Sequence, residues 1–383
     1  MDRPSIYFDN NATTRPLREV REAMMDSLSD SFANASSAHS SGKASRVKVV
    51  QARDAVAQLV GALPEQVVFT SGGTEANNQV LLSAVRNRGQ HPHIITSTVE
   101  HSSILKTCEY LEREGLATIS YLPVDSAGVV DAWALAETIN DKTCLVSIQW
   151  VNNETGVIQD IEALGAVCRE KGVLFHTDAA QAAGKIEMDF SGLPVDFLTF
   201  TAHKIHGPQG VGAIVAKNLT TLSPILHGGS QEGGLRPGTE NLAGIVGFGV
   251  AAKIRTMNFS EVGSHLKLCR DRFETELKSS GLPLVVNGNT SRRVSNTSSI
   301  QFSGIEGLAL MARLGSAGVV CSQSSACTNQ RPEPSYVLSA MGLSEEEAYA
   351  SVRFCFAQDN TQDEVERAVS EIKMICDELQ GGW

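Results

Sequence analysis

Short apolar runs of strand-like composition alternate with helical segments through the first two thirds of the chain. The strand-like runs are 66–70, 93–97, 145–151, 172–178, 197–201 and 210–216. The helical segments are 17–28, 45–59, 79–86, 161–171 and 242–257, with one more that begins after His101. Strands that alternate with helices of this length form a mainly parallel sheet with helices on both faces. The pattern therefore predicts an α/β fold with a doubly wound, mainly parallel sheet.

Two ionisable residues end or follow strands of this sheet. Lys204 follows the run 197–201, and Asp178 ends the run that begins at Gly172. Ligands of α/β sheets bind at the carboxyl ends of strands, where desolvation makes a lysine amine a nucleophile for a carbonyl, hence for a Schiff base. Asp178 is placed to pair with a pyridinium nitrogen. Either residue alone could be half of a buried ion pair; together they predict a site for pyridoxal 5′-phosphate.

A glycine-rich turn, 71–78, joins the strand 66–70 to the next helix. Gly73 and Thr74 stand at the start of that helix, where unpaired N–H groups and the helix dipole favour a phosphate. The turn contains neither a GxGxxG motif nor a Walker lysine. A dinucleotide or nucleoside triphosphate is therefore disfavoured.

Three further polar residues accompany apolar strands. His101 follows the strand 93–97, and its imidazole could stack on a flat ring and move protons; a polar residue at a helix start is the alternative. Asn153 follows a buried strand with an amide suited to hold a ring hydroxyl or a carboxylate. Arg353 lies inside the apolar strand 351–356 and needs an anion, either a substrate α-carboxylate or an internal ion-pair partner.

Two long polar segments predict loops with a function. The segment 319–334 is rich in small residues and ends in prolines, which predicts an exposed, mobile loop. Cys327 in this loop is not core filling and belongs to the reactive class of thiols. The glycine-rich segment 227–241 suits a loop that crosses to a second subunit, where Thr239 would complete a phosphate site.

Composition excludes several classes of protein. The net charge of −11 argues against direct nucleic-acid binding. No run of about 18 uninterrupted apolar residues predicts a membrane span, and the N-terminus lacks the pattern of a signal peptide. The eight cysteines lack metal-ligand spacing, so we expect no metal site and no structural disulfide. The expected compartment is the cytoplasm.

The length of 383 residues suits a large domain and a smaller one. We predict a large cofactor-binding domain over 15–258. A smaller α+β domain is predicted from 1–14 with 259–383, and it would carry the cysteine loop at about 320–334.

The sequence resembles the cysteine desulfurase family of class V pyridoxal phosphate enzymes over nearly its whole length. The carrying motifs are Tyr7–Thr14, Thr70–Glu75, Glu100–His101, Val151–Gly156, Thr177–Gln181, Ala202–Lys204, Arg236–Thr239, Ser325–Thr328 and Glu333–Leu338. The long loop with Ser-Ala-Cys-Thr is similar to that of the first subgroup, the iron–sulfur-cluster desulfurases. The resemblance implies fold type I, with a seven-stranded sheet in the large domain.

The resemblance also implies roles around the cofactor ring. Lys204 would hold the cofactor covalently and later move protons. Asp178 would pair with the pyridine nitrogen, Gln181 would contact the ring hydroxyl, and His101 would stack on the ring and take part in catalysis. Cys327 would take the sulfur of the substrate as a persulfide.

Further residues are implied to bind the phosphate or the substrate. The implied phosphate ligands are Gly73, Thr74, Thr201 and His203, with Thr239 from the second subunit. Asn153 is implied at both the cofactor and the substrate, whose carboxylate would also meet Arg353 and Asn11. The sequence departs from the usual Ser-Ser-Gly-Ser-Ala-Cys at Ser322–Cys327, which leaves the acceptor in doubt.

The resemblance thus implies a homodimeric enzyme that converts L-cysteine to L-alanine and passes sulfur to a protein docking near the Cys327 loop. Iron–sulfur cluster assembly, tRNA thiolation and DNA phosphorothioation stay open as pathways; the segment Arg331–Ser335 resembles desulfurases of the last. A selenocysteine lyase or another class V aminotransferase is the alternative enzyme. The non-enzymatic alternative is a scaffold that keeps the fold but only docks sulfur-transfer proteins.

Overall fold

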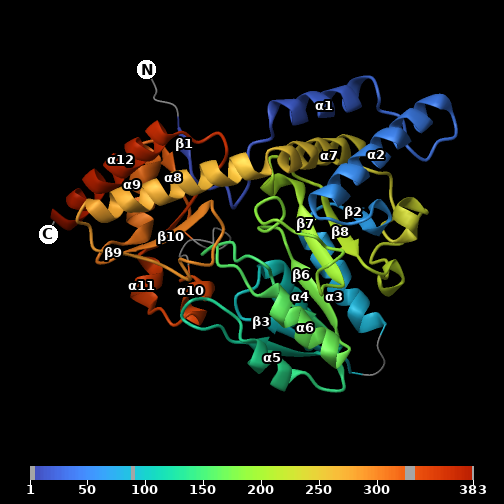
Figure 1. The fold of residues 1–383 in the computed structure, drawn as a ribbon, viewed down its shortest axis with the longest axis horizontal. Coiled ribbons are helices and arrows are strands. Elements are labelled where there is room, and N and C mark those ends of the chain that lie inside the picture. The colour runs from blue at the N-terminus through green and yellow to red at the C-terminus, as the bar shows by residue number, and fades with distance from the viewer. Residues whose placement is uncertain (1–4, 88–90, 324–332, 382–383) are drawn as a thin grey trace.

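A seven-stranded sheet forms the centre of the computed structural model, which describes residues 5–87, 91–323 and 333–381 (Figure 1). Its strands are β2 (Val67–Thr70), β3 (His93–Ser97), β4 (Thr118–Leu122), β5 (Thr143–Ser147), β6 (Leu174–Asp178), β7 (Phe197–Thr201) and β8 (Gly212–Ala216). Their order is β2-β8-β7-β6-β5-β3-β4, and β8 is antiparallel to both of its neighbours, whereas the other pairs are parallel. The prediction of a mainly parallel seven-stranded sheet is confirmed.

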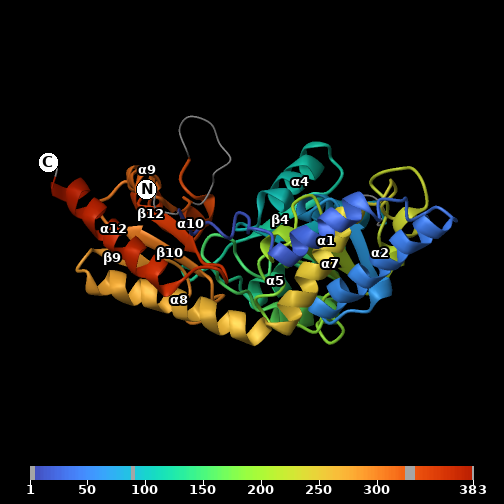
Figure 2. The same cartoon turned by 90° about the horizontal axis from the view of Figure 1, so that it is seen from above.

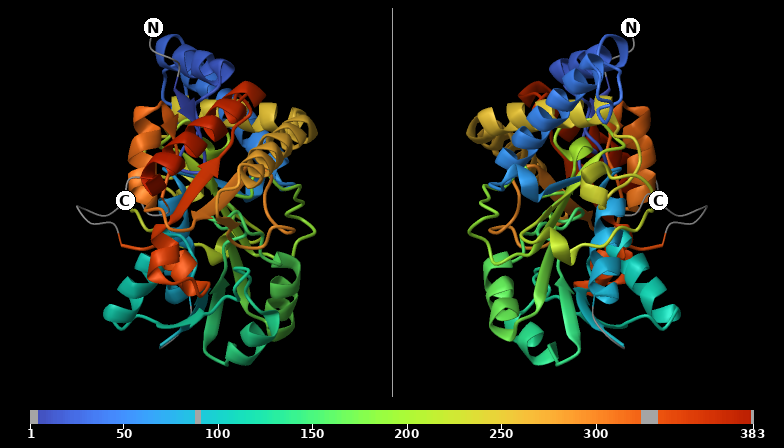
Figure 3. Two further views of the ribbon diagram at one scale, coloured as in Figure 1. Left: turned by 90° about the vertical axis from the view of Figure 1, so that its left-hand side faces the viewer. Right: turned by 90° about the vertical axis from the view of Figure 1, so that its right-hand side faces the viewer.

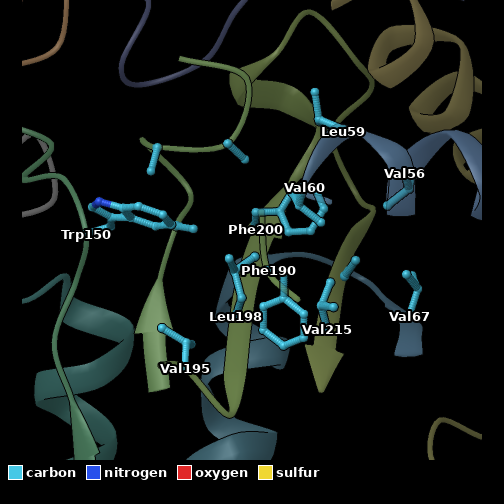
Figure 4. Close-up of a cluster of buried hydrophobic side chains, with 14 of the residues drawn as sticks. Val56, Leu59, Val60, Val67, Trp150, Phe190, Val195, Leu198, Phe200 and Val215 are labelled. Atoms are coloured by element: carbon cyan, nitrogen blue, oxygen red, sulfur yellow. The ribbon is translucent and has the colours of Figure 1, made fainter. Parts of the chain in front are cut away.

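Helices cover both faces of this sheet. They are α1 (Arg18–Ser29), α2 (Ser40–Leu59), α3 (Gly73–Arg86), α4 (Ser102–Arg113), α5 (Ala132–Thr138), α6 (Ile161–Lys171) and α7 (Leu242–Met257). Alternate residues of β7 face opposite sides: Phe197 packs with α3 and α4, whereas Leu198 and Phe200 pack with α2 and α7 (Figure 4). Both sides of the strand are apolar because both are buried, as parallel sheets require.

A second, smaller core lies beside the large sheet. Its strands are β1 (Ile6–Tyr7), β9 (Leu284–Val286), β10 (Thr297–Phe302), β11 (Val319–Val320) and β12 (Ser351–Cys355). Its helices are α8 (Phe259–Ser279), α9 (Gly307–Ser316), α10 (Tyr336–Ala340), α11 (Glu345–Tyr349) and α12 (Gln362–Gly381). Helices α8 and α12 pack together over this core, next to β10 and β12 (Figures 2 and 3). Asn258 separates α7 from α8. The division into 15–258 and 1–14 with 259–383 stays a prediction.

Several boundaries differ from those that the sequence pattern predicts. The strand predicted over 145–151 ends as β5 at Ser147. The backbone N–H groups of Ile148 and Trp150 still bond to β6, but the N–H of Gln149 between them donates to the Glu100 carboxylate at 2.9 Å and not to a neighbouring strand. Helix α3 begins at Gly73 rather than residue 79, and α2 begins at Ser40 rather than residue 45. Strand β4 and helix α5 were not predicted.

No helix in the described ranges is both long and apolar enough to cross a membrane. Within the same ranges, no group of three or more His, Cys, Asp or Glu side chains is arranged to hold a metal ion.

Candidate active site

Lys204 lies at the end of a short 3-10 turn, η2 (Ala202–Lys204), that directly follows β7. Its Nζ donates hydrogen bonds to the backbone oxygens of Asn11 at 2.5 Å and Ala12 at 2.7 Å. Burial, with the nearby positive charge of Arg353, lowers the pKa of the Lys204 amine to about 8. A substantial fraction of this amine is therefore neutral near pH 8 and able to attack a carbonyl.

Asp178 ends β6, two strands from β8 and next to β7 in the sheet. Its Oδ2 accepts a hydrogen bond from Asn77 Nδ2 at 2.7 Å, and its Oδ1 accepts one from the backbone N–H of Ala180 at 2.9 Å. The amide of Asn77 is oriented in turn by Thr199, whose hydroxyl donates to Asn77 Oδ1 at 2.5 Å. The Asp178 carboxylate is thus fixed in a buried network at the carboxyl end of its strand.

The two histidines near Lys204 are held from different elements. His101 caps the N-terminus of α4, and its Nδ1 lies 2.8 Å from the Ser103 hydroxyl, which also accepts from Asn77. His203 belongs to η2, and its Nδ1 lies 3.2 Å from the Thr13 hydroxyl. Burial lowers the pKa of His101 and lowers that of His203 to about 4, with Lys204 adding to both effects. Both imidazoles are consequently neutral at physiological pH.

Gln181 lies in the turn after β6. Its Nε2 donates to the backbone oxygen of Asn11 at 2.9 Å, which is also an acceptor for Lys204. The side chain of Asn11 donates to the Asn153 backbone oxygen at 3.0 Å. The segment around Asn11 therefore connects the residues that follow β5, β6 and β7.

Arg353 reaches the same place from β12 of the smaller core. Its guanidinium donates to the Asn153 backbone oxygen at 3.1 Å and forms an ion pair with Asp9 at 2.7 Å. Two buried polar atoms here, Arg353 Nε and Asn153 Oδ1, have no hydrogen-bond partner among the described residues. Asp9 is thus the internal ion-pair partner of Arg353. The N–H at Nε of the guanidinium remains available to an anion.

Helix α3 begins beside this group. The first intrahelical bond runs from Ala76 N to Gly72 O, so the N–H groups of Gly73, Thr74 and Glu75 lack intrahelical acceptors. A Cβ atom placed on Gly73 would meet nothing within 4 Å, so the space in front of the helix is open. Thr201, at the end of β7, donates its hydroxyl to Val211 O at 3.0 Å.

Two predicted site residues are not placed with this group. Thr239 is exposed in the loop before α7, which Arg236 ties to Glu75 of the same chain at 2.9 Å. Its predicted contribution comes from a second subunit, which a single chain does not test. Cys327 lies outside the described residues.

Asn77, Asp9 and Lys185 belong to the site, although the pattern of the sequence did not single them out as functional. Lys185 follows Gln181 by four residues and donates to its Oε1 at 2.5 Å. An amide or amine spaced by three or four residues from a predicted ligand, on a helix or helical turn, is the signal that would have found Asn77 and Lys185.

Glu100, next to His101, is fully buried and accepts hydrogen bonds from Ser97 Oγ at 2.6 Å and from the backbone N–H of Gln149 at 2.9 Å. Burial raises the pKa of its carboxyl from 4.5 to about 8. The folded state therefore binds this proton more tightly than the unfolded state, and stability falls as pH rises between these two values.

We expect Glu100→Gln to flatten that dependence, because an amide does not ionise. The variant should unfold at a higher temperature than the unchanged protein at pH 9, and at a similar temperature at pH 5. Thermal unfolding followed by circular dichroism measures this, with the exposed Glu65→Gln as the matched control. Parallel pH profiles for the unchanged protein and Glu100→Gln would contradict it.

Comparison with known proteins identifies the family to which this arrangement of residues belongs. The family profile described as aminotransferase class V matches residues 6–368. The chain belongs to the class V aminotransferase family. Members of this family use pyridoxal 5′-phosphate, which agrees with the prediction made from Lys204 and Asp178.

Relatives within the family are named cysteine desulfurases. The chain is 40% identical over 375 residues to the cysteine desulfurase of Nostoc sp., covering 98% of this chain and 94% of the relative. It is 38% identical over 377 residues to the cysteine desulfurase NifS of Azotobacter vinelandii, with 98% and 93% covered. The recognition of the cysteine desulfurase family is confirmed.

Solved structures agree with these relatives. A NifS-like protein superposes with a TM-score of 0.90 at 34% identity, over 97% of this chain and 99% of that chain. A structure described as SspA in complex with cysteine superposes with a TM-score of 0.82 at 34% identity, over 93% and 100%.

Proposed function

We propose that this protein is a cysteine desulfurase that depends on pyridoxal 5′-phosphate. It converts L-cysteine to L-alanine and leaves the sulfur as a persulfide on Cys327. The observation that carries the proposal is that Lys204, Gln181 and Arg353 bond to the backbone oxygens of Asn11 and Asn153, two residues that are themselves hydrogen-bonded to each other. Relatives that bear the name cysteine desulfurase, and a similar structure whose title includes cysteine, support it.

The residues present fit the cofactor. The N-terminus of α3 offers free N–H groups and open space to a phosphate, with Thr201 and His203 at the end of β7 beside it. Asp178 would hold the pyridine nitrogen, Gln181 the ring hydroxyl, and His101 the face of the ring. The unpartnered Oδ1 of Asn153 and Nε of Arg353 are the groups that a bound ligand would satisfy.

The side chains of this site have separable tasks. When bound, pyridoxal 5′-phosphate supplies an electron sink for the carbon that bears the substrate amine. Lys204 moves protons at Nζ, because its lowered pKa lets the amine both accept and release a proton near neutral pH. Arg353 and Asn153 hold the α-carboxylate of L-cysteine, and the charge-assisted bond to Arg353 orients the substrate.

The sulfur step falls to Cys327. Its thiolate forms an S–S bond with the sulfur of L-cysteine while the C–S bond of the substrate breaks. The carbon that loses sulfur takes up a proton, which gives L-alanine, and the persulfide remains on the protein. A second thiol then accepts that sulfur.

The purified protein loaded with the cofactor tests the proposal. Incubation with L-cysteine should give L-alanine in equal amount to transferred sulfur, and mass spectrometry should find Cys327 heavier by one sulfur atom. A protein that takes up no cofactor, or that releases no alanine, would refute the proposed activity.

Asp178→Asn should lower kcat by about 100-fold or more, because a neutral amide cannot stabilise a protonated ring nitrogen. Its NH₂ group would also face one of the two donors that now bond to the carboxylate, either Asn77 Nδ2 or Ala180 N. Steady-state alanine formation measures the loss. The exposed Asp54→Asn is the control, and a kcat within twofold of the unchanged protein for Asp178→Asn would argue against the assigned role.

We also propose that the protein is a homodimer in which Thr239 reaches the partner's phosphate site. Helices α1 and α2 lie on the side of the molecule away from the smaller core (Figure 1). These helices and the loop between them carry exposed apolar side chains, which are 50% to 76% exposed: Met25, Leu28, Phe32, Val47 and Val50. The ion pair between Lys48 and Asp26 holds these segments together. An apolar face of this kind supports burial in a subunit interface.

The acceptor is proposed to be a protein that docks near the Cys327 segment. Glu333, which follows that segment, lines a groove of about 730 Å³ together with Glu306, Glu345 and Glu346. Such a groove favours a partner with basic side chains. We further propose a cytoplasmic location, since the seven cysteines in the described ranges are all free thiols. The sulfur pathway stays open among the three alternatives given above.

A further inference from the structure

A second lysine lies behind the candidate active site. Lys185 and Gln181 belong to the helical turns that follow β6, where the backbone N–H groups of Ala183 and Lys185 bond to Ala179 O and Ala182 O at 2.8 Å. A spacing of four residues in such turns puts the two side chains on one side. Gly184 allows this turn to approach α7, because a Cβ atom at Gly184 would lie 2.8 Å from Arg255 Cγ.

Both acceptors of Lys185 are amide oxygens. Its Nζ donates to Gln181 Oε1 at 2.5 Å and to Asn11 Oδ1 at 3.2 Å. A protonated lysine has only donors to offer, whereas an amide can turn either its oxygen or its NH₂ group toward a neighbour. Lys185 therefore orients the Gln181 amide and, together with Asn296, the Asn11 amide.

The orientation of these two amides fixes hydrogen bonds at residues of the proposed active site. With Oε1 bound to Lys185, Gln181 directs Nε2 to the backbone oxygen of Asn11, the atom that also accepts from Lys204. With Oδ1 bound to Lys185 and to Asn296 Nδ2, Asn11 directs its own Nδ2 to Asn153 O at 3.0 Å. One amine thus orders the polar groups at the ends of three strands.

The surroundings of Lys185 are cationic. A small cavity is lined by Lys185, Lys204, His206 and Arg255, and no carboxylate is among its lining residues in the described part of the chain. Arg353 and the Cys355 thiol also act on Lys185, and Asp359 acts on the neighbouring His206. Burial lowers the pKa of Lys185 to about 7. The neutral amine still carries two N–H donors, so both amides stay oriented across the neutral range.

We propose that Lys185 is a positioning residue, which turns Gln181 so that an N–H, and not a carbonyl oxygen, faces the ring hydroxyl of the cofactor. This inference rests on the proposed function. A donor at that hydroxyl favours its ionised form and so lowers the pH at which the bound cofactor changes its visible absorption. The residue acts through Gln181 and need not touch the cofactor.

The pH titration of the visible absorption of the loaded protein tests this role. Lys185→Met removes both donors and frees the Gln181 amide to rotate, so the midpoint should rise by about one pH unit, as for the loss of one hydrogen bond to a charged oxygen. Lys185→Arg keeps a side chain that has only donors, and its midpoint should stay within a few tenths of a unit. Lys253→Met, on the exposed face of α7, is the control and should not move it.

The outcomes separate this inference from the proposed function. If the unchanged protein takes up no cofactor, the proposed function fails. If it takes up the cofactor and Lys185→Met titrates with the same midpoint, the positioning role alone is overturned. A shift in Lys185→Arg as large as that in Lys185→Met would also overturn it, because a side chain with only donors at this position should keep Gln181 oriented. If Lys185→Met does not fold, Lys185→Ala carries the test with the same expected rise.

Discussion

Lys204→Ala is expected to lose turnover of L-cysteine by at least about 1,000-fold, the range of a positioned proton-transfer group together with a covalent anchor. The variant should also lose covalent attachment of the cofactor. Lys204 Nζ lies 2.5 Å from Asn11 O, in the site that the ends of β5, β6 and β7 define, and its lowered pKa supplies the neutral amine that this attachment needs. Removal of a buried amine should leave the fold intact, since burying an amine opposes folding.

Borohydride reduction followed by mass spectrometry measures the attachment independently of turnover. The unchanged protein should gain one cofactor on the peptide that contains Lys204, and Lys204→Ala should gain none. The exposed Lys171→Ala is the matched control and should behave as the unchanged protein. An adduct on Lys185 in the Lys204→Ala variant, with turnover retained, would show that the wrong lysine had been assigned.

Cys327→Ser is expected to abolish the persulfide and to reduce alanine formation to background. The step needs a thiolate. Among the described cysteines, burial raises the pKa of Cys108, Cys168, Cys321 and Cys376 to about 12 and raises that of Cys269 and Cys355 as well. These thiols stay protonated at neutral pH and cannot replace Cys327.

Cys321→Ser is the matched control, because Cys321 is close to Cys327 in sequence but has a thiol that does not ionise at neutral pH. Its alanine and persulfide yields should equal those of the unchanged protein. Full release of sulfide and alanine by Cys327→Ser would favour the alternative, a selenocysteine lyase or another class V enzyme. Loss of both products in Cys321→Ser would move the sulfur step to a different thiol.

The partner of Arg353 is an example of a contact that the sequence pattern could not predict. An arginine in an apolar strand predicts a buried anion, and two anions were open, a substrate carboxylate and an internal acid. The structure supplies Asp9, which is 344 residues away in sequence, and still leaves Nε without a partner. No local pattern could identify Asp9, because the contact between Arg353 and Asp9 depends on how β12 lies beside the segment after β1.

The sequence by itself determined the strand-and-helix alternation, and with it the sheet, because side-chain periodicity is a local property of the chain. It also placed Lys204 and Asp178 at strand ends, since a charged residue that ends an apolar run is visible without any partner. Only the tertiary structure decided that Asn77 fixes Asp178 and that Lys185 orients Gln181 and Asn11. Asn77 and Asp178 are 101 residues apart, and Lys185 and Asn11 are 174 apart. Hydrogen bonds between such residues form only where the packed sheet brings strand ends together. The partner of each residue is therefore set by the fold and not by the residues next to it in the sequence.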